Sequence, residues 1–223
     1  MSLPLIRLAA VDSTQAFLRR NPHLGFCAVL ADRQSEGRGR QGNRWESAAG
    51  AGLWMSAALP APAGVAPGLV LQRAMTAAAR VLDPGGQILG LKWPNDLVAW
   101  REGRLVKLGG ILGEQSGGRL ILGLGVNLTE APEIPGRAIP PACLTELGLK
   151  PPAATDLATH IISLWEGLRQ EYQVPFRWPA AGVALQWEEG QGTCLGWEPD
   201  GRLKVATPQG IRRLSAGDVA GLV

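Results

Sequence analysis

Histidine and cysteine are scarce in this chain of 223 residues. The two histidines, His23 and His160, are too few to favour a histidine-based metal centre or a catalytic triad. The three cysteines, Cys27, Cys143 and Cys194, are odd in number and far apart, so they indicate reduced thiols rather than a disulfide framework or a zinc site. We therefore expect a protein of a reducing compartment, the cytoplasm.

Long apolar runs are also missing. The apolar run at residues 3–10 is too short and too interrupted for a signal or membrane segment. There is no repeat, no GxxxxGK[ST] phosphate loop, and no room before the first motif at Asp12 for an N-terminal helix-turn-helix module. The net charge of +3 is mild and fits an anionic small molecule or an acidic partner at least as well as nucleic acid.

Hydrophobic periodicity predicts few helices and many short strands. Helices are expected at residues 15–20, 68–82 and 155–172, and strands at residues 25–31, 52–59, 87–91, 97–100, 104–107, 109–114 and 119–127. Successive hairpins with few helices predict an α+β fold, in which helices flank a mixed, mostly antiparallel sheet.

The last forty residues differ in character from the rest. Turn-rich runs at residues 192–197, 202–207 and 211–214 predict a small C-terminal β-barrel. We therefore expect a main domain over residues 1–180 and a small barrel domain over residues 183–223.

Residues 34–45, QSEGRGRQGNRW, alternate glycine and arginine before a tryptophan. Glycines allow backbone conformations at positive φ, and guanidinium groups grip phosphate or carboxylate with paired hydrogen bonds. The simplest interpretation is a mobile loop that closes over an anion, and the alternative is a solvated surface turn. The spacing GxGxxG also matches the dinucleotide fingerprint, but no strand runs directly into the first glycine and no apolar helix opens after the last.

The pentapeptide Lys92-Trp-Pro-Asn-Asp96 follows a predicted strand. Because Pro94 cannot donate to a sheet ladder, the segment must lie at a strand end or a bend. A lysine there holds a point charge in a fixed place, or simply extends to water. Asn95 and Asp96 suit a nucleotide or a magnesium ion, or only a turn.

Taken together these stretches resemble the biotin protein ligases. The shared motifs are DST at 12–14, QxxGRGRxGxxW at 34–45, KWPND at 92–96, GGILGE at 109–114 and GLGVNL at 123–128. The resemblance covers residues 10–127, with a weaker echo at 190–219. It implies that the main domain binds biotin and ATP, activates biotin with MgATP to biotinyl-5′-adenylate and pyrophosphate, and passes biotin to a lysine of a carrier domain.

The resemblance also implies roles by position. Catalysis is expected from Lys92 and Arg40. Biotin binding is expected from Ser13, Thr14, Gln15, Gln34, Arg38, Gly39, Arg40 and Lys92. Nucleotide binding is expected from Arg38, Arg40, Trp45, Lys92, Asn95 and Asn127. No protein ligands are assigned to Mg²⁺, which is expected to arrive through the ATP phosphates, and no tightly bound prosthetic group is expected.

Two residues depart from the family pattern. Gln15 stands where asparagine is common after Ser-Thr, and Asn43 replaces a frequent arginine of the loop. The longer Gln15 side chain remains able to hydrogen-bond biotin. Loss of a cation at Asn43 is expected to weaken the grip of the loop without changing its role.

The chemistry implied by the resemblance needs cations and protection from water. Attack of a carboxylate on an α-phosphate brings two anions together, which Lys92, Arg40 and Mg²⁺ would stabilise. A closed glycine–arginine loop would shield the mixed anhydride from hydrolysis. The acceptor lysine must lose a proton before it attacks, so either nearby cations lower its pKa or a carboxylate such as Asp96 assists.

Several alternatives remain at this stage. Lipoate attachment uses a related fold and the same adenylate logic. A basic nucleic-acid-binding module would need aromatics interleaved with cations, and a biotin-storage protein would bind without turnover. A biotin-responsive repressor is disfavoured because no DNA-binding domain is recognised. The expected partner is the biotin carboxyl carrier domain of acetyl-CoA carboxylase or of another biotin-dependent carboxylase, without nucleic acid or membrane, and ligases of this family often form homodimers.

Overall fold

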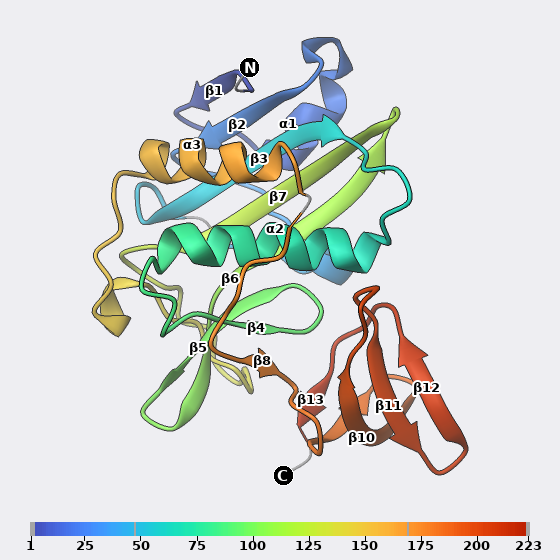
Figure 1. The fold of residues 1–223 in the computed structure, drawn as a ribbon. Coiled ribbons are helices and arrows are strands. Elements are labelled where there is room, and N and C mark those ends of the chain that lie inside the picture. The colour runs from blue at the N-terminus through green and yellow to red at the C-terminus, as the bar shows by residue number, and fades with distance from the viewer. Residues whose placement is uncertain (1–2, 47, 169, 222–223) are drawn as a thin grey trace.

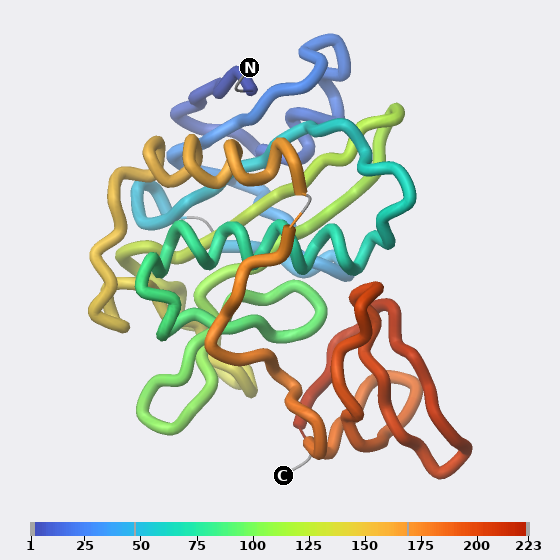
Figure 2. The backbone as a smooth tube through the Cα atoms, in the orientation of Figure 1, coloured from blue at the N-terminus to red at the C-terminus, as the bar shows by residue number. Residues whose placement is uncertain are grey.

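The computed structural model describes residues 3–46, 48–168 and 170–221. The chain forms a large eight-stranded sheet covered by helices and a smaller five-stranded sheet beside it (Figure 1 and Figure 2). The strand order of the large sheet is β1-β2-β3-β7-β6-β5-β4-β8. Its strands are β1 (Leu5–Leu8), β2 (Cys27–Ala31), β3 (Gly52–Pro60), β4 (Gly90–Lys92), β5 (Asp96–Arg101), β6 (Arg104–Ser116), β7 (Arg119–Asn127) and β8 (Arg177–Trp178).

Most neighbours in this sheet run antiparallel. Among the ladders of the described residues, only β1–β2 and β4–β8 are parallel. The long ladders β2–β3, β3–β7 and β6–β7 are antiparallel. The predicted α+β fold with a mixed, mostly antiparallel sheet is thereby confirmed. No helix of the described residues combines the length and apolar character needed to span a bilayer.

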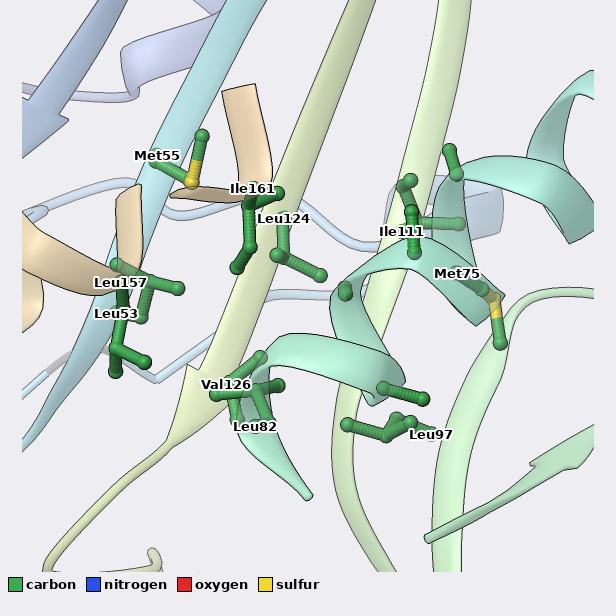
Figure 3. Close-up of a cluster of buried hydrophobic side chains, with 14 of the residues drawn as sticks. Leu53, Met55, Met75, Leu82, Leu97, Ile111, Leu124, Val126, Leu157 and Ile161 are labelled. Carbon is green, nitrogen blue, oxygen red and sulfur yellow. The ribbon is translucent and has the colours of Figure 1, made fainter. Parts of the chain in front are cut away.

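Two helices, α2 (Pro67–Leu82) and α3 (Ala154–Trp165), cover one face of the large sheet. α2 begins at a proline, which suits the first turn of a helix because no N–H partner is needed there. Met55 of β3 and Leu124 of β7 belong to the core beneath these helices (Figure 3). Because side chains alternate across a strand, the intervening residues of β3 and β7 face the opposite side.

The opposite face is only partly covered. Helix α1 (Thr14–Arg20) packs Leu18 against Val29, Ala58 and Ile121 at one end of the sheet. The helix starts where it does because the Ser13 side chain accepts a hydrogen bond from the backbone N–H of Ala16, at 3.4 Å. The rest of this face borders a cavity.

The C-terminal strands form an antiparallel sheet in the order β12-β11-β10-β9-β13. No ladder joins the outer strands of this sheet within residues 170–221, so the predicted β-barrel is not confirmed. The second outer strand is only two residues long, which limits closure. The strands are β9 (Ala184–Trp187), β10 (Gly190–Trp197), β11 (Leu203–Thr207), β12 (Gly210–Leu214) and β13 (Ala220–Gly221).

A tryptophan next to a strand of the large sheet lies in the core of the small sheet. The core of the small sheet contains Leu185, Cys194 and Val205, and it also contains Trp93 of the Lys-Trp-Pro-Asn-Asp segment. The Trp93 side chain is fully buried, and its indole N–H donates to the carbonyl of Gly201 at 3.1 Å. The segment that follows β4 therefore carries a side chain from the large sheet into the hydrophobic core of the small one.

The predicted end of the third helix is wrong. α3 ends at Trp165 rather than at Tyr172, because Glu166 and Gly167 form a turn and Leu168 takes a φ of 38°. The carbonyl of Leu168 instead accepts a hydrogen bond from Arg73 of α2. Arg169, inside the predicted helix, lies outside the described residues.

Some strands also differ from the prediction. β4 begins at Gly90, three residues later than expected, and the predicted strands at 104–107 and 109–114 are one continuous strand. The short strands β1, β8, β9 and β13 were not predicted. Each of these four has four residues or fewer, which leaves no clear periodicity in the sequence.

Candidate active site

A cavity of about 550 Å³ lies on the open face of the large sheet. Its floor is the middle of the sheet, where Ser56 of β3 pairs with Gly123 of β7, and Gly110 of β6 pairs with Gly125. Its lining also includes the glycine–arginine loop, part of the proline-rich loop 129–142 and the C-terminal segment 218–221. All eleven residues predicted for the site line this cavity: Ser13, Thr14, Gln15, Gln34, Arg38, Gly39, Arg40, Trp45, Lys92, Asn95 and Asn127.

One end of the cavity is a buried polar cluster. The side-chain carbonyl of Gln34 accepts hydrogen bonds from the Thr14 backbone N–H at 2.8 Å and from the Thr14 hydroxyl at 3.1 Å. The same hydroxyl lies 2.8 Å from the hydroxyl of Ser56. Ser13 and Thr14 are both buried, so the Asp-Ser-Thr motif caps α1 and also lines the cavity. Ser56 was not predicted, because nothing distinguishes a serine in an apolar strand until the strand faces are known.

Gln15 occupies space left by a glycine. A Cβ atom on Gly123 would lie 2.4 Å from the Gln15 side-chain oxygen, so the longer side chain fits because β7 has no side chain there. The Gln15 amide nitrogen is buried without a hydrogen-bond partner. Because an unsatisfied buried donor costs about 1–3 kcal/mol, this nitrogen is suited to a ligand acceptor.

The glycine–arginine loop is folded into a short hairpin over the cavity. The Trp45 N–H donates to the Gly37 carbonyl at 2.8 Å, and the Gly39 N–H donates to the Asn43 carbonyl at 2.7 Å. Positive φ occurs at Gly42, at 76°, and also at the neighbouring Gln41, at 53°. Asn43 uses its side chain to bond the carbonyl of Arg40, so the residue that departs from the family pattern closes the turn.

The ring of Trp45 fastens the hairpin to the sheet. A Cβ atom on Gly125 would lie 2.8 Å from that ring, so the indole needs the bare backbone of β7. The ring meets Trp54 edge-on, with centroids 6.3 Å apart, and the Lys107 ammonium lies 5.6 Å from its centre. These contacts explain why a tryptophan follows the glycines and arginines of the loop.

We expect Trp45→Ala to loosen the loop. The lost aromatic pair is worth about 0.5–1.5 kcal/mol, which corresponds to a roughly twofold to tenfold larger open population. Trypsin cleavage at Arg38, Arg40 and Arg44 should accelerate by the same factor, provided that reclosing outpaces cleavage. Trp100→Ala is the control, because Trp100 is exposed and outside the cavity. Equal cleavage rates in the wild type and the Trp45 variant would contradict this role.

Lys92 is a buried cation between two carboxylates. Its ammonium lies 3.9 Å from Asp96 and 4.0 Å from Asp218, and 5.5 Å from the centre of the Trp178 ring. Burial lowers the pKa of Lys92 below its ordinary value, and the two carboxylates oppose that shift, while Lys107 and Arg40 add to it. An anion bound beside Lys92 would restore the lost solvation and favour the charged form.

Arg40 connects three parts of the molecule. From the loop, one of its nitrogens donates to the Asn95 side-chain oxygen at 3.3 Å and to the carbonyl of Gly217 in the C-terminal region at 3.2 Å. The Asn95 amide in turn donates to the Ile111 carbonyl at 2.8 Å. Arg40 therefore lies where the loop, the Lys-Trp-Pro-Asn-Asp segment and the C-terminal sheet meet.

Sequence reasoning missed Lys107. This lysine of β6 lies 2.7 Å from Asp96 and lines the cavity. Asp96 is nearly buried, with one oxygen beside Lys107 and the other near Lys92, so it holds two cations in place. The available signal was the position of Lys107 two residues before Gly109-Gly110, but only the strand pairing shows that it meets Asp96.

Asn127 offers a buried carbonyl oxygen. Its amide donates to the Ala142 carbonyl at 3.1 Å, and its side-chain oxygen has no partner. Oxygen ligands suit Mg²⁺, but the described residues contain no cluster of three acidic, histidine or cysteine side chains that would hold a metal ion. The residues present therefore fit a metal that arrives already bound to phosphates, with Asn127 as a candidate oxygen contact.

The remaining wall comes from the proline-rich loop 129–142. Pro132, Ile134 and Arg137 line the cavity, and the Lys107 N–H holds the loop to β6 through the Pro140 carbonyl at 2.9 Å. The sequence motifs assign no role to this loop. Arg137 adds to the cationic lining of the cavity.

Comparison with known proteins agrees with this architecture. Residues 10–128, just over half of the chain, match the model of the Biotin/lipoate A/B protein ligase family. The bifunctional ligase/repressor BirA of Bacillus subtilis is 28% identical over 95% of this chain and 71% of its own length. The biotin–[acetyl-CoA-carboxylase] ligase of Mycobacterium tuberculosis is 33% identical over an aligned region that covers 60% of this chain and 50% of that relative.

A solved structure extends the likeness to the whole chain. The biotin protein ligase from Aquifex aeolicus in complex with biotin and ATP superposes with a TM-score of 0.74 and 26% identity, covering 98% of each chain. The chain belongs to the Biotin/lipoate A/B protein ligase family. Within that family it is an enzyme of the biotin protein ligase type, which confirms the resemblance seen in the motifs.

Proposed function

We propose that the protein activates biotin with MgATP to biotinyl-5′-adenylate and transfers the biotin to a lysine of a biotin carboxyl carrier domain. The observation that carries the proposal is the convergence of all the predicted site residues on one cationic cavity. Three polar atoms of that cavity, on Gln15, Trp45 and Asn127, are buried without partners, which is the state expected of a site built for a polar ligand.

The polar cluster at Thr14 and Gln34 supports placement of the biotin ring there. Thr14 has a hydroxyl and Gln15 an unpartnered amide nitrogen in the cavity, and both suit the ureido group of biotin. The acyl chain would then run across the glycine floor of β7 toward Lys92. We propose that Ser13, Gln34, Arg38 and Gly39 complete this part of the site.

Lys92 and Arg40 are proposed as the catalytic cations. When the biotin carboxylate attacks the α-phosphate, both groups are anionic, and fixed cations stabilise the charge that develops. Lys92 is suited to this role because it is buried and cannot move far. Arg40 is suited because it reaches the site from the loop that covers it.

ATP is proposed to lie beside Asn95, Asn127 and Trp45, with its magnesium ion held mainly by the phosphates. The ion would neutralise phosphate charge, and Asn127 would offer it or the phosphates a polar contact. The loop hairpin, fastened by Trp45, would keep water from the mixed anhydride.

We propose further that residues 1–180 form the domain that binds biotin and ATP, and that residues 183–223 form a separate small domain that closes the site.

The carrier domain of acetyl-CoA carboxylase, or of another biotin-dependent carboxylase, is the proposed acceptor. The relative from Mycobacterium tuberculosis carries acetyl-CoA carboxylase in its name. The nucleic-acid alternative needs exposed aromatics interleaved with cations, whereas Trp100 is the only exposed tryptophan of the eight, all of which lie in the described residues. This distribution favours the ligase proposal.

The test combines the protein with biotin, MgATP and a carrier domain, followed by weighing of the carrier. A gain of one biotinyl group on a single lysine is expected, together with biotin-dependent exchange of pyrophosphate into ATP. Pyrophosphate exchange that depends on lipoate instead of biotin would indicate that the protein attaches lipoate. Tight biotin binding without exchange or transfer would indicate a storage protein and overturn the proposal.

A further inference from the structure

Three carboxylates line the proposed cavity: Glu46, Asp96 and Asp218. Six cations line it as well: Arg38, Arg40, Arg44, Lys92, Lys107 and Arg137. Because biotin and ATP are both anions, a carboxylate at this place opposes their binding unless it is paired or serves a cation. Each of the three carboxylates therefore needs an explanation.

Two of them are explained by their neighbours. Asp96 is nearly buried and held between Lys107 and Lys92, so it is neutralised and closed to a further cation. This geometry argues against the hypothesis that Asp96 assists the acceptor lysine. Glu46 belongs to the covering loop and pairs with Arg44 of the same loop at 3.8 Å.

Asp218 is different because it faces both the solvent and the reaction centre. Its side chain is 66% exposed, yet its carboxylate lies 4.0 Å from the Lys92 ammonium. The residue before it, Gly217, accepts the hydrogen bond from Arg40 that ties the C-terminal region to the loop. Asp218 is thus an accessible carboxylate at the edge of the cavity, next to both proposed catalytic cations.

We propose that Asp218 is the docking group for the acceptor lysine, an inference that rests on the proposed function. Its carboxylate receives the ε-ammonium of the incoming carrier lysine at the solvent-facing edge, a few ångströms from the anhydride held at Lys92. The positive charge of the carrier lysine explains why an exposed carboxylate lies among the cations of the cavity. Before docking, Asp218 serves as a counter-ion to Lys92.

The transfer step balances without a further reactant. The docked ammonium loses one proton to water at the exposed edge, and the amine lone pair then forms the C–N bond to the biotinyl carbonyl. The bond from that carbonyl to the phosphate oxygen breaks, and AMP leaves with the electron pair. The second proton on nitrogen is lost to water, which gives the neutral amide. Asp218 orients the ammonium and is not itself the base.

The proposal predicts opposite effects of Asp218→Asn on the two half-reactions. Without the carboxylate beside Lys92, the KM for biotin in pyrophosphate exchange should fall by roughly twofold to fivefold. Without the docking group, the KM for the carrier should rise by roughly fivefold, as expected for one partly exposed charge pair. Asp218→Glu should restore most of the carrier KM.

Two controls separate docking from a general structural role. Glu189→Gln removes a similarly exposed carboxylate in the turn between β9 and β10, which pairs only with Arg212 among the ion pairs of the described residues, and it should change neither KM. At saturating biotin and MgATP, hydroxylamine, which is uncharged at neutral pH, should trap the adenylate equally well in the wild type and in Asp218→Asn. Parallel losses in exchange, hydroxylamine trapping and carrier transfer would overturn the proposal. Absence of biotin-dependent exchange in the wild type would instead overturn the proposed function.

Discussion

Replacing Lys92 with methionine is expected to lower biotin-dependent pyrophosphate exchange by two to three orders of magnitude, while the fold becomes more stable. A fixed donor that stabilises developing charge is worth about 3–4 kcal/mol in comparable sites. Lys92 is close enough to the loop arginine Arg40 for their charges to interact, and no other lysine of the described cavity lining is as deeply buried. Methionine keeps an unbranched side chain that is one heavy atom shorter, and it removes the charge together with the N–H donors.

The gain in stability follows from the direction of the pKa shift. Burial lowers the pKa of Lys92 from its ordinary value of 10.5, so above the lowered value the unfolded chain binds more protons than the folded one. Stability therefore rises with pH between the lowered pKa and 10.5, and the penalty is fully present below that window. Lys92→Met should remove this part of the pH dependence, which urea titrations of both proteins across the range would show.

Lys150→Met is the control for both measurements, because Lys150 is exposed and outside the cavity. It should leave the exchange rate and the pH dependence of unfolding unchanged. If Lys92→Met lost stability at neutral pH, the ammonium would be a net stabilising partner of Asp96. The proposal that the buried Lys92 ammonium favours binding of an anionic ligand would then be wrong. Exchange within tenfold of the wild type would remove Lys92 from catalysis.

The sequence predicts the fold well wherever a hydrophobic pattern extends over many residues. The helix at Pro67–Leu82 and the strands at Gly52–Pro60 and Arg119–Asn127 follow from runs of nine or more residues with a clear pattern. The failures are local. The third helix ends at Trp165 because the turn that follows lets Leu168 bury its side chain and accept a hydrogen bond from Arg73, a tertiary contact that helix propensity does not contain.

The candidate site was predictable only in part. Motifs place Ser13, Gln34, Arg40 and Lys92, since each motif combines residues that are unusual together. Asp218, like Lys107, carries no such signal, because an aspartate in a turn-rich segment resembles any surface turn. The proposed role of Asp218 depends on its contact with Lys92, which is 126 positions away in the chain, and only the folded structure reveals that contact.

The joint between the two sheets explains how the C-terminal region reaches the site. The carbonyl of Gly201, in the turn between β10 and β11, accepts hydrogen bonds from Gln72 of α2 and from Trp93, both at 3.1 Å. Trp93 is adjacent to Lys92 and is buried in the core of the small sheet. The same contact therefore fixes the small sheet on the large one and holds the proposed catalytic lysine.

Gly201→Ala is accordingly expected to destabilise the protein by about 3–5 kcal/mol and to lower pyrophosphate exchange at least tenfold. The added Cβ atom would lie 2.4 Å from the carbonyl carbon of Gly68 and 2.5 Å from the nitrogen of Leu69, and this backbone at the start of α2 cannot yield as a side chain would. The positive φ of 88° adds about 1–2 kcal/mol of strain, and each lost hydrogen bond adds about 1 kcal/mol.

Gly210→Ala provides the matched control for that prediction. Gly210 also has a positive φ, of 115°, in the same small sheet, but a Cβ atom there meets open space. It should show the backbone strain alone, with normal exchange, whereas Gly201→Ala should show the additional loss. The comparison uses urea midpoints at equal m-values, because a change in midpoint alone reports stability. Equal losses in the two variants would mean that the turn at Gly201 does not join the sheets, and that the small sheet is not held to Lys92 through Trp93.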